Sequence, residues 1–458
     1  MNSAIILAAG VGTRFKSAIP KIFHTVGGLS LLDHVIHSAL SAGLEDITVV
    51  LRPGYEAFPL KFADAVSFAY QSTVKGSSDA VKCALKSQNN LSVEVNCEKE
   101  PFCNNFEWIY ILYGDIPLVT PETLQALSEV AKICEKTAVV VLAMNSAHAK
   151  ELGKLEPAAV AGTIKGIIEA KDASAFVETI PLCNAGLLVR KDLLYKLISE
   201  IKPSPVTGEF YITEIVRLAY EAGYVCRYYE ADAAELSGVN SRQELAVIEQ
   251  YFQNRMRKKH MDNGVTLVAP ETVFFSFDTT IENDVIIDPF VTFGPNVHLK
   301  SGTHINSFCV VEGADIKNAA VGPFARIRPN TQISENAKIG NFVEIKNSLV
   351  QKNAKINHLS YVGDSEIGKN TNIGAGTITC NYDGFQKHKI CIGENVFIGS
   401  NSALVAPVEI GDNAMIGAGS VITQKVEPGF LAISRTPQRN IENGSIEFRE
   451  LKSKKSRQ

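Results

Sequence analysis

The stretch IGENVFIGSNSALVAPVEIGDNAMIGAGSVI, residues 392–422, places an aliphatic residue at every sixth position, from Ile392 to Ile422. An α-helix repeats its faces every 3.6 residues and a β-strand every two, so neither element accounts for this period. A six-residue repeat is typical of a parallel β-helix, in which each hexad supplies one short strand and a turn. The stretch therefore predicts a solenoid built around a column of buried aliphatic side chains.

The same period extends upstream through most of the C-terminal part of the chain. Six-residue steps run from Ile281 to Val311 and from Val321 to Ile345, and two steps of five residues join these runs. The shorter steps fit solenoid corners that are trimmed by one residue. So many positions in register favour a real repeat over chance periodicity. We therefore expect a left-handed parallel β-helix, followed by a C-terminal tail, over residues 263–458.

One segment of the predicted solenoid, TCNYDGFQKH at residues 379–388, fits no hexad. We expect this segment to protrude as a loop. Polar and aromatic side chains on a loop that a rigid solenoid holds are typical of binding and catalytic sites.

The first part of the chain has a different pattern, in which short β-rich runs alternate with amphipathic helical segments. This alternation predicts an α/β, Rossmann-like domain over residues 1–240, with a mostly parallel sheet between helices. Ligands of such sheets bind at the C-terminal ends of the strands. We expect residues 241–262 to form a connecting helix, because they have helical spacing and few breakers. The clearest predicted strands are 47–51, 108–113 and 138–143, and the clearest predicted helices are 31–42 and 121–132.

Composition and charge narrow the class of protein. A net charge of −4 argues against a dedicated nucleic-acid-binding protein. We expect the two basic runs, residues 255–260 and 452–457, to be a solvated helix face and a frayed tail. The 9 cysteines form no CxxC pair, which favours free thiols in a reducing cytoplasm. We also expect no signal peptide and no membrane contact, since no apolar run approaches the roughly 20 residues that span a bilayer.

The segment LAAGVGTRF, residues 7–15, follows a short apolar run and has the character of a phosphate-binding turn. It is neither a Walker A loop nor a dinucleotide fingerprint, because the residues after its GxG differ from both. Taken alone, the GxG is compatible with a tight packing turn as well as with a phosphate site. The nearby cations Arg14 and Lys21 favour a triphosphate.

A second polar segment, YGDIPL at residues 113–118, ends another predicted strand. Its carboxylate, Asp115, could hold Mg²⁺, which takes few protein ligands and keeps substrate phosphates in its remaining positions. The alternative is that Asp115 only caps the turn before Pro117. The cationic loop elsewhere in this domain favours the metal.

These segments resemble the sugar-phosphate nucleotidyltransferases. With the hexapeptide solenoid joined to them, almost the whole chain resembles the bifunctional GlmU family, whose members acetylate glucosamine-1-phosphate and then make UDP-N-acetylglucosamine. The most specific shared stretch is NIGAGTITCNYDG at residues 372–384. Further matching stretches are GIIEAKDA at 166–173, CNAGLLV at 183–189, GEFYITEI at 208–215 and GVNSR at 238–242.

The resemblance implies a uridylyltransferase site in the first domain, with UTP and N-acetylglucosamine-1-phosphate as substrates. Transfer of this kind depends on charge neutralisation and positioning more than on an acid or a base. By resemblance, Asp115 and Asn240 bind Mg²⁺, and Arg14 and Lys21 bind the phosphates. The remaining nucleotide and sugar contacts implied are Leu7, Ala8, Ala9, Gly10, Gln71, Gly76, Ser77, Tyr113, Gly114, Gly153, Glu169 and Asn184, with Asn240 also counted among them.

The loop that would contact uracil departs from the family pattern. The family's QxxxxGTAHA becomes QSTVKGSSDA at residues 71–80, so that Ser77 stands in place of Thr and Asp79 in place of the usual His. Residues 89–107 also look longer than usual. These departures leave the preference for uridine open.

The second domain would acetylate an amine from a thioester, which needs a base for the amine proton and support for the oxyanion. His358, in NHLSYVGD at residues 357–364, could be a structural histidine, but the resemblance makes it the general base. The resemblance further implies that Arg328, Lys346, Tyr361 and Asn372 bind the sugar phosphate. Ala375, Ser400, Ala418 and Arg435 would line the acetyl-CoA groove, and Asn381 and Tyr382 would contact one of these two substrates.

The family's β-helices associate as homotrimers with each acetyl site between subunits, and we expect the same assembly here. Two alternatives remain from the sequence. One activity alone could survive, with the acetyltransferase favoured by the altered uracil loop. A noncatalytic, sugar-nucleotide-binding regulatory subunit is the other, but it would be expected to lose Lys21, Asp115 or His358, and all three are present.

Overall fold

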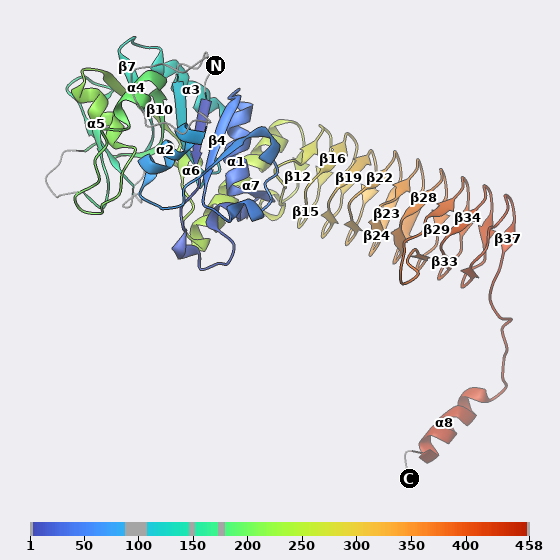
Figure 1. The fold of residues 1–458 in the computed structure, drawn as a ribbon. Coiled ribbons are helices and arrows are strands. Elements are labelled where there is room, and N and C mark those ends of the chain that lie inside the picture. The colour runs from blue at the N-terminus through green and yellow to red at the C-terminus, as the bar shows by residue number, and fades with distance from the viewer. Residues whose placement is uncertain (1–2, 88–107, 146–151, 173–178, 456–458) are drawn as a thin grey trace. The chain divides into compact units, whose positions relative to one another are not determined.

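The computed structural model describes residues 3–87, 108–145, 152–172 and 179–455. The predicted insertion at 89–107 lies outside these residues. The chain divides into two compact units, Met1–Met256 and Arg257–Gln458 (Figure 1). The division falls inside helix α7, Arg242–Asp262, in the segment where we expected a connecting helix.

The first unit is built on a nine-stranded sheet with the order β5-β4-β1-β6-β10-β7-β11-β9-β8. Strand β1 (Ser3–Leu7) runs parallel to both of its neighbours, β4 (Asp46–Leu51) and β6 (Trp108–Tyr113). Residues 47–51 of β4 are all buried and, apart from Thr48, apolar, as in strands covered on both faces. The other strands are β5 (Ser67–Tyr70), β7 (Thr137–Asn145), β8 (Lys154–Pro157), β9 (Thr163–Ile168), β10 (Leu182–Arg190) and β11 (Val225–Ala231).

The sheet is less parallel than we expected from the strand–helix alternation. Strand β10 runs antiparallel between β6 and β7, and β9 pairs antiparallel with β8 and β11. A parallel pair needs a crossover, usually a helix, and the described residues between β7 and β10 form no helix. The half of the sheet around β1, which carries the two polar segments, is parallel as expected.

Helices cover this sheet and begin at residues suited to capping. Helix α1 (Leu31–Ser41) begins after Ser30, whose side chain accepts from the Asp33 amide, and α3 (Pro121–Ala131) begins after Thr120 in the same way. The other helices of this unit are α2 (Ser77–Ser87), α4 (Lys191–Leu197), α5 (Glu214–Glu221) and α6 (Ala233–Leu236). None of the helices in the described ranges is long and apolar enough to cross a membrane.

The second unit is a parallel β-helix made of three sheets (Figure 1). The first sheet runs from β12 (Thr266–Leu267) to β37 (Leu431–Ala432), the second from β13 (Thr280–Ile281) to β34 (Val408–Ile410), and the third from β15 (Thr292–Phe293) to β36 (Val421–Ile422). Every position of the predicted repeat, from Ile281 to Ile422, is buried. The hexad prediction is therefore confirmed, and the arrangement is consistent with the expected left-handed form.

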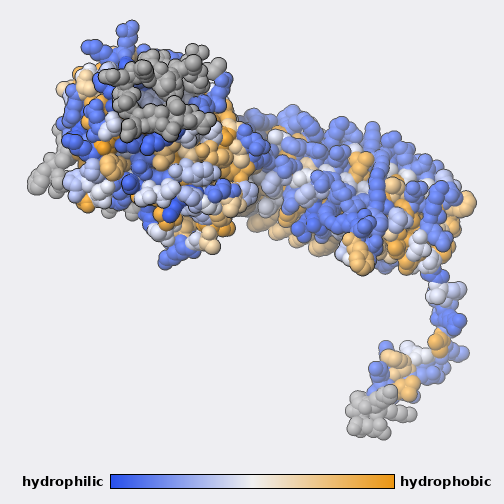
Figure 2. Space-filling view, viewed as in Figure 1, coloured by the Kyte–Doolittle hydropathy of each residue, from blue (hydrophilic) through white to orange (hydrophobic). Residues whose placement is uncertain are grey.

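The corners of the solenoid adopt the left-handed backbone region. Most corner positions carry Asn, which tolerates positive φ, but one corner carries phenylalanines at φ of 56° to 63°. Their rings stack with centroids 4.8–5.2 Å apart and about half of each side chain is exposed. We call this row the phenylalanine ladder; its members are Phe290, Phe308, Phe324 and Phe342. Figure 2 shows apolar residues along one edge of the β-helix.

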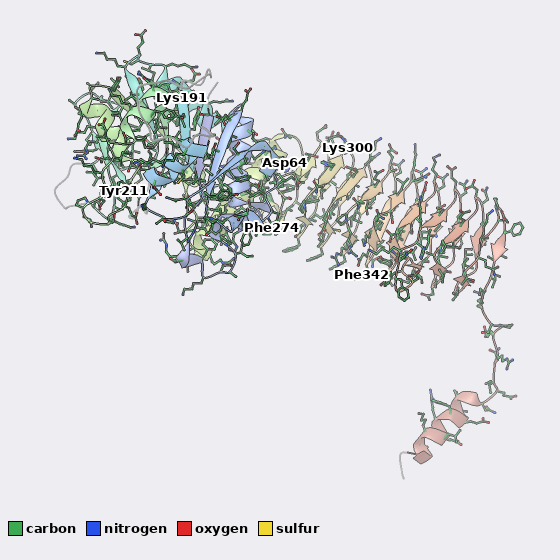
Figure 3. All side chains as sticks on the ribbon, viewed as in Figure 1. Asp64, Lys191, Tyr211, Phe274, Lys300 and Phe342 are labelled. Carbon is green, nitrogen blue, oxygen red and sulfur yellow. The ribbon has the colours of Figure 1, made fainter. Side chains whose placement is uncertain are left out.

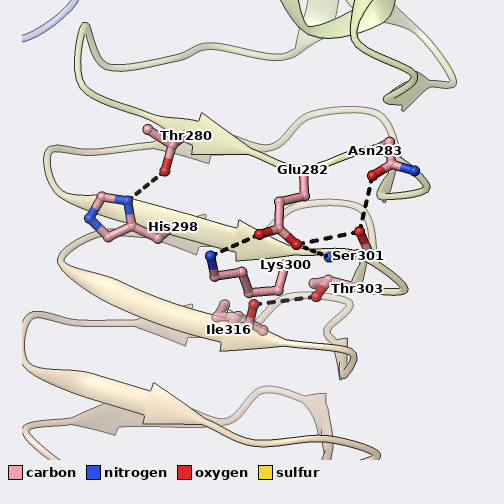
Figure 4. A network of polar contacts seen from close by, with 8 residues as sticks. All are labelled: Thr280, Glu282, Asn283, His298, Lys300, Ser301, Thr303 and Ile316. Atoms are coloured by element: carbon pink, nitrogen blue, oxygen red, sulfur yellow. Dashed lines mark hydrogen bonds and ion pairs between the residues drawn. The ribbon is translucent and has the colours of Figure 1, made fainter.

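The opposite edge of the β-helix is polar, and Figure 3 shows Lys300 on the other side from Phe342. There, side chains on successive coils bind one another (Figure 4). Lys300 donates to Glu282 at 2.8 Å, and Thr280 contacts the ring of His298 at 2.5 Å. Such exposed pairs stabilise the fold only slightly.

Two expectations for the basic runs are corrected. Residues 255–260 are not simply a solvated face, because Arg257 and His260 are buried. The Arg257 guanidinium donates to the carbonyls of Glu271 and Val273, both at 3.1 Å, which satisfies two backbone acceptors at the start of the solenoid. The tail also forms a helix, α8 (Gly444–Lys455), instead of fraying after residue 452.

Candidate functional site

The phosphate-binding turn follows the end of β1 and depends on Gly12. This residue has φ of 62°, and a Cβ placed on it would lie 2.8 Å from the Cβ of Lys21. The glycine therefore allows the segment that carries Lys21 to pack against the turn. Gly10 and Arg14 are exposed on the same turn. The structure thus brings both predicted phosphate-binding cations to one edge of the sheet.

Lys21 lies at the centre of the predicted metal ligands. Its ammonium donates to the carboxylate of Asp115 and to Oδ1 of Asn240, the latter at 2.9 Å. Because an ammonium can only donate, both partners present oxygen to the same point. Backbone contacts place these ligands: the Gly114 amide donates to Leu7, and the Val239 amide donates to Asp115, each at 2.9 Å.

A carboxylate and an amide oxygen that converge on one cation form a donor set that suits Mg²⁺. In the described ranges no group of three or more His, Cys, Asp or Glu side chains could hold a metal ion. A two-ligand site is nevertheless sufficient when substrate phosphates and water complete the coordination. The residues present therefore fit the expected metal.

The predicted sugar contacts gather beside this cluster. The Asn184 amide donates to the Tyr113 hydroxyl at 3.0 Å, and the Asn184 backbone donates to the carbonyl of Gly153 at 3.0 Å. Glu169 lies next to Gly153 and accepts from Thr213 at 2.6 Å. Burial raises the pKa of Glu169, and the Thr213 hydrogen bond partly offsets this rise.

The loop after β5 is held by the segment at 210–212. A Cβ on Gly76 would lie 2.5 Å from the carbonyl oxygen of Phe210, so only glycine fits there. The Ser77 hydroxyl accepts from the Ile212 amide at 2.9 Å, which gives the hydroxyl at this atypical position a structural role. Gln71 is buried and binds both this loop and Asp79.

In the second unit, the predicted phosphate-binding cations lie on successive coils of the third sheet. Arg328 follows β21 (Arg326–Ile327) and pairs with Glu344 at 2.8 Å, and Lys346 ends β24 (Glu344–Lys346). Lys387, which the sequence analysis missed, reaches Lys346 from the protruding loop. The neighbouring Lys387 lowers the pKa of Lys346, because two ammonium groups close together repel each other. The sequence signal for this third cation was a basic residue within residues 379–388, the one long segment that fits no hexad.

Lys387 lines a groove of about 480 Å³ together with Asp364 and His388, whereas Arg328 and Lys346 are not among its lining residues. We call it the cation groove. The Asn381 amide donates to the Asp364 carboxylate, and a Cβ on Gly363 would meet the Tyr361 hydroxyl at 2.5 Å. Tyr361 and Asn381 thus belong to this side of the solenoid. The Tyr382 hydroxyl instead donates to the carbonyl of Gly384 within the exposed loop.

His358 ends β26 (Lys355–His358), and its Nδ1 lies 2.5 Å from Oδ1 of Asn341 on the preceding coil. If Asn341 presents its oxygen, Nδ1 carries the proton and Nε2 is left as the basic nitrogen. Asn341 was not predicted, although it lies one coil before His358. Both residues line a second groove of about 490 Å³, with Phe324 and Phe342 of the ladder. We call it the histidine groove.

The predicted acetyl-CoA residues form a column over successive coils. The Asn401 amide donates to Ala375, and the Gly419 amide donates to Ser400, each at 2.8 Å. The Arg435 guanidinium reaches back to the carbonyl of Ala418. His358 adjoins the column, because its carbonyl accepts from the Gly376 amide at 3.3 Å. Ala375, Ser400, Ala418 and Arg435 therefore lie along one column of the solenoid, and their role in an acetyl-CoA groove stays a prediction.

Within one chain, the structure does not bring all of the predicted acetyltransferase residues together. The cation groove and the histidine groove share no lining residue. Asn372 pairs with Lys355, at the other end of the strand from His358, and Asn381 lies by Asp364, not in the Ala375 column. The proposed base and the proposed phosphate ligands thus occupy different corners of the solenoid.

Comparison with known proteins agrees with both folds. Residues 4–184 match the MobA-like NTP transferase domain, residues 278–313 and 392–424 match the bacterial transferase hexapeptide, and residues 316–384 match the GMPPB C-terminal domain. "Bifunctional protein GlmU" from Zymomonas mobilis is 45% identical, with 99% of this chain and 98% of that protein covered. The proteins of this name from Paramagnetospirillum magneticum and Wolbachia pipientis are each 41% identical, over 98% and 95% of this chain and 96% and 97% of their own lengths. The chain belongs to the bifunctional GlmU family.

Proposed function

We propose that each unit of this chain carries out one of the two reactions of its family, with the residue roles given below. The chain is a bifunctional acetyltransferase and uridylyltransferase. One observation supports the division of labour most strongly. Lys21, Asp115 and Asn240 converge at a strand edge in one unit, and His358 adjoins a column of small residues in the other.

In the acetyltransferase reaction, the amine of glucosamine-1-phosphate attacks the thioester carbon of acetyl-CoA, and the C–S bond breaks to release the CoA thiol. His358 takes a proton from the amine through Nε2, since Asn341 holds Nδ1. Ser400, in the column, is placed to support the carbonyl oxygen as charge develops on it. Arg328, Lys346 and Lys387 hold the phosphate of the sugar.

In the uridylyl transfer, a phosphate oxygen of N-acetylglucosamine-1-phosphate attacks the α-phosphorus of UTP, and pyrophosphate leaves. Asp115 and Asn240 would hold Mg²⁺, which supplies charge neutralisation for the triphosphate. Arg14 and Lys21 bind phosphate oxygens, while Gly10 leaves the approach to the turn open. Gly153, Glu169 and Asn184 position the sugar.

We infer a homotrimer in which each acetyltransferase site draws on two chains. His358 lines the histidine groove, whereas Arg328, Lys346 and Lys387 do not, so one chain alone separates the base from the proposed phosphate ligands. The half-exposed phenylalanine ladder borders the histidine groove and offers a straight apolar edge to another copy. We propose the domain limits 1–240, 241–262 and 263–458. We also propose that the enzyme is cytoplasmic, because a reducing compartment would keep the seven described cysteines free.

The assembly has a direct test. His358→Ala and Lys346→Ala variants should each be inactive in acetylation, but co-refolded or co-expressed mixtures should recover about a quarter of wild-type activity, because that fraction of shared sites combines two intact halves. Homogeneous variants prepared in the same way are the control. A mixture that stays inactive would mean that each site lies within one chain.

The function itself is tested by incubating the full chain with acetyl-CoA, UTP, Mg²⁺ and glucosamine-1-phosphate. We expect release of both CoA and pyrophosphate, with pyrophosphate release dependent on prior acetylation. CoA release without pyrophosphate would leave an acetyltransferase alone. Binding of UDP-N-acetylglucosamine without either product would support the regulatory alternative.

The residue assignment is tested by His358→Ala. This variant should lose CoA release but retain pyrophosphate release from N-acetylglucosamine-1-phosphate and UTP. His298→Ala is a matched control, because His298 lies in the same solenoid and contacts only a surface threonine in Figure 4. Loss of both reactions in a folded His358→Ala trimer would contradict the division between the units.

A further inference from the structure

The side chain of Gln71 is held in one orientation by groups that can only accept hydrogen bonds. Its Nε2 donates to the Asp79 carboxylate at 2.9 Å and to the carbonyl of Gly76 at 3.1 Å. Both partners, a carbonyl and a carboxylate, can only accept. The alternative orientation would place Oε1 against two oxygens. The contacts therefore fix which end of the Gln71 amide faces the loop.

The surroundings make this orientation rigid. Gln71 is 2% exposed and its backbone amide donates to Leu51 at 2.8 Å, so both its backbone and its side chain are fixed. Gly76 has φ of 117° and cannot carry a side chain beside Phe210. The carbonyl of Gly76 is thereby held in place. Asp79 lies in the first turn of α2, where the helix N-terminus favours a negative charge.

One polar atom of the Gln71 side chain, Oε1, is left to meet a ligand. No group among the described residues donates a hydrogen bond to Oε1. Gln71 follows β5, which pairs with β4, and β4 pairs with β1, whose end carries the phosphate-binding turn. Two strand spacings, about 10 Å, separate these positions, a span that a nucleotide can bridge between its base and its phosphates.

We propose that Asp79 is a positioning residue that makes Gln71 a hydrogen-bond acceptor, so that the site selects a pyrimidine base carrying an N3–H donor over one carrying an N3 lone pair. This inference rests on the uridylyltransferase function proposed above and adds the basis of its base preference. Uracil has a donor at N3, whereas cytosine has an acceptor there and would meet Oε1 with repulsion. The residue that departs from the family pattern thus favours uridine.

The chemistry at this position differs from that of a histidine. A neutral imidazole can present either a donor or an acceptor, depending on its tautomer, and an imidazolium can only donate. A carboxylate only accepts, so it holds the Gln71 amide in one sense. Asp79 would therefore orient Gln71 by different chemistry from the usual His, without loss of the site's function.

The test compares UTP with CTP in the Asp79→Asn variant, using N-acetylglucosamine-1-phosphate and the full chain. Asparagine keeps the size of Asp79 but can donate as well as accept, which allows the Gln71 amide to reverse. We expect the ratio of kcat/KM for UTP to that for CTP to fall by about tenfold, the effect of one misdirected hydrogen bond. The change should appear mainly as a raised KM for UTP.

A double variant separates positioning from a general structural effect. In a Gln71→Ala background, Asp79→Asn should leave the UTP to CTP ratio unchanged, because the orienting effect acts through Gln71. Ser72→Ala, at an exposed position of the same loop, is the control for the loop itself. The Trp108 fluorescence of the same preparations reports that the first unit is folded.

The outcomes distinguish this inference from the proposed function. If the wild-type chain releases no pyrophosphate with any nucleotide, the proposed function is wrong and the inference falls with it. If the wild type uses UTP and CTP equally, or if Asp79→Asn keeps the wild-type ratio, the positioning role alone is overturned. A ratio that falls equally in the presence and absence of Gln71 also overturns it.

Discussion

The two units hold the cations of their proposed sites in opposite ways. In the first unit, the Lys21 ammonium is buried and already bonded to Asp115 and Asn240. In the second unit, Lys346 and Lys387 contact each other, and this contact lowers the pKa of Lys346. One site pairs its cation with oxygen ligands, whereas the other brings like charges together.

The difference favours a metal in the first of the two proposed sites. Oxygen ligands around a lysine would repel a triphosphate unless another cation joins them, so we expect the first site to bind a metal together with its nucleotide. Adjacent ammonium groups are unfavourable alone but become favourable when a phosphate lies between them. The second site can therefore bind a sugar phosphate without a metal.

Metal removal should have the largest effect and should separate the two reactions. An excess of chelator is expected to abolish pyrophosphate release, because Asp115 and Asn240 would lose the ion that they are proposed to share. CoA release should be unchanged, since the cation groove uses side-chain ammonium groups. Parallel assays on one preparation, with restoration by added Mg²⁺, check this. A chelator that stops both reactions would contradict the comparison.

Removal of one lysine from the contacting pair, Lys346 and Lys387, should have the next largest effect. Lys346→Met and Lys387→Met should each raise the KM for glucosamine-1-phosphate by roughly 10- to 100-fold, since each removes a charged contact to phosphate. Steady-state CoA release measures this change. Lys389→Met is the matched control, because Lys389 lines the same groove as Lys387 but pairs with Glu366 at 3.0 Å.

If the KM for glucosamine-1-phosphate is unchanged in Lys387→Met, the protruding loop does not contribute to the phosphate site. A large effect of Lys389→Met would mean that the net charge of the groove, and not the paired cations, decides binding. Either result would weaken the contrast between Lys21, which is paired with oxygen ligands, and the Lys346–Lys387 pair, which brings like charges together.

Much of the fold could be predicted because the sequence repeats a physical requirement. Each coil needs one inward aliphatic residue, and the period from Ile281 to Ile422 therefore marks buried positions directly. The strand at 108–113 was equally clear, since it is a short apolar run. The antiparallel β10 was missed because strand direction depends on connections, which composition alone does not reveal.

The sites were only partly predictable for a related reason. Motifs located Lys21, Asp115 and His358, and the family resemblance also indicated Asn240. The contacts between these residues and their partners could not be derived from the sequence, because Asn240 bonds Lys21 across more than two hundred residues and Asn341 meets His358 only because one coil stacks on the next. The roles proposed for Lys387 and Asp79 depend on side-chain directions in a loop and in the first turn of a helix, and a sequence pattern does not encode these directions.

A smaller effect is expected when the lysine of the first site is removed in the absence of nucleotide. The Lys21 ammonium lies where a metal would meet Asp115 and Asn240, so it should compete with the metal. Lys21→Met should therefore bind Mn²⁺ at least about tenfold more tightly than the wild type without nucleotide. Calorimetry or the electron paramagnetic resonance of free Mn²⁺ measures this difference.

The control for this experiment is Lys16→Met, which removes an exposed cation at the end of the same turn. It should leave Mn²⁺ affinity near that of the wild type. With UTP present, the wild type should bind Mn²⁺ tightly, because the triphosphate attracts Lys21 and supplies further metal ligands. Equal affinities of wild type and Lys21→Met without UTP would show that Lys21 and the metal occupy different positions.

The smallest effect on function, but a clear one on stability, should come from a buried histidine in each unit. Burial lowers the pKa of His34 and of His260 to about 4, so both are neutral in the folded chain near neutral pH. The unfolded chain protonates them near their ordinary value of 6.5. Their neutral forms therefore support folding above about pH 6.5, and this support falls by about 2 kcal/mol per histidine at about pH 5.

The two histidines differ in their partners, which makes their variants differ at neutral pH. His34 donates through Nε2 to the Val26 carbonyl at 2.8 Å, so His34→Phe should lower the free energy of unfolding by about 1–3 kcal/mol. Neither ring nitrogen of His260 has a partner among the described residues, and its ring packs against Phe275. At neutral pH, His260→Phe should therefore leave the free energy of unfolding unchanged or raise it. It should also abolish the part of the stability loss at about pH 5 that His260 causes.

Urea unfolding at pH 7.5 and at about pH 5 checks both expectations. Trp108 is the single tryptophan and lies in β6, so its fluorescence reports the first unit, while far-UV circular dichroism also follows the strands of the solenoid. If acid lowers the unfolding free energy of the second unit as much in His260→Phe as in the wild type, a group other than His260 must cause that loss of stability. That result would mean that the second unit tolerates a protonated His260. The first unit, by contrast, is expected to be destabilised when His34 is protonated.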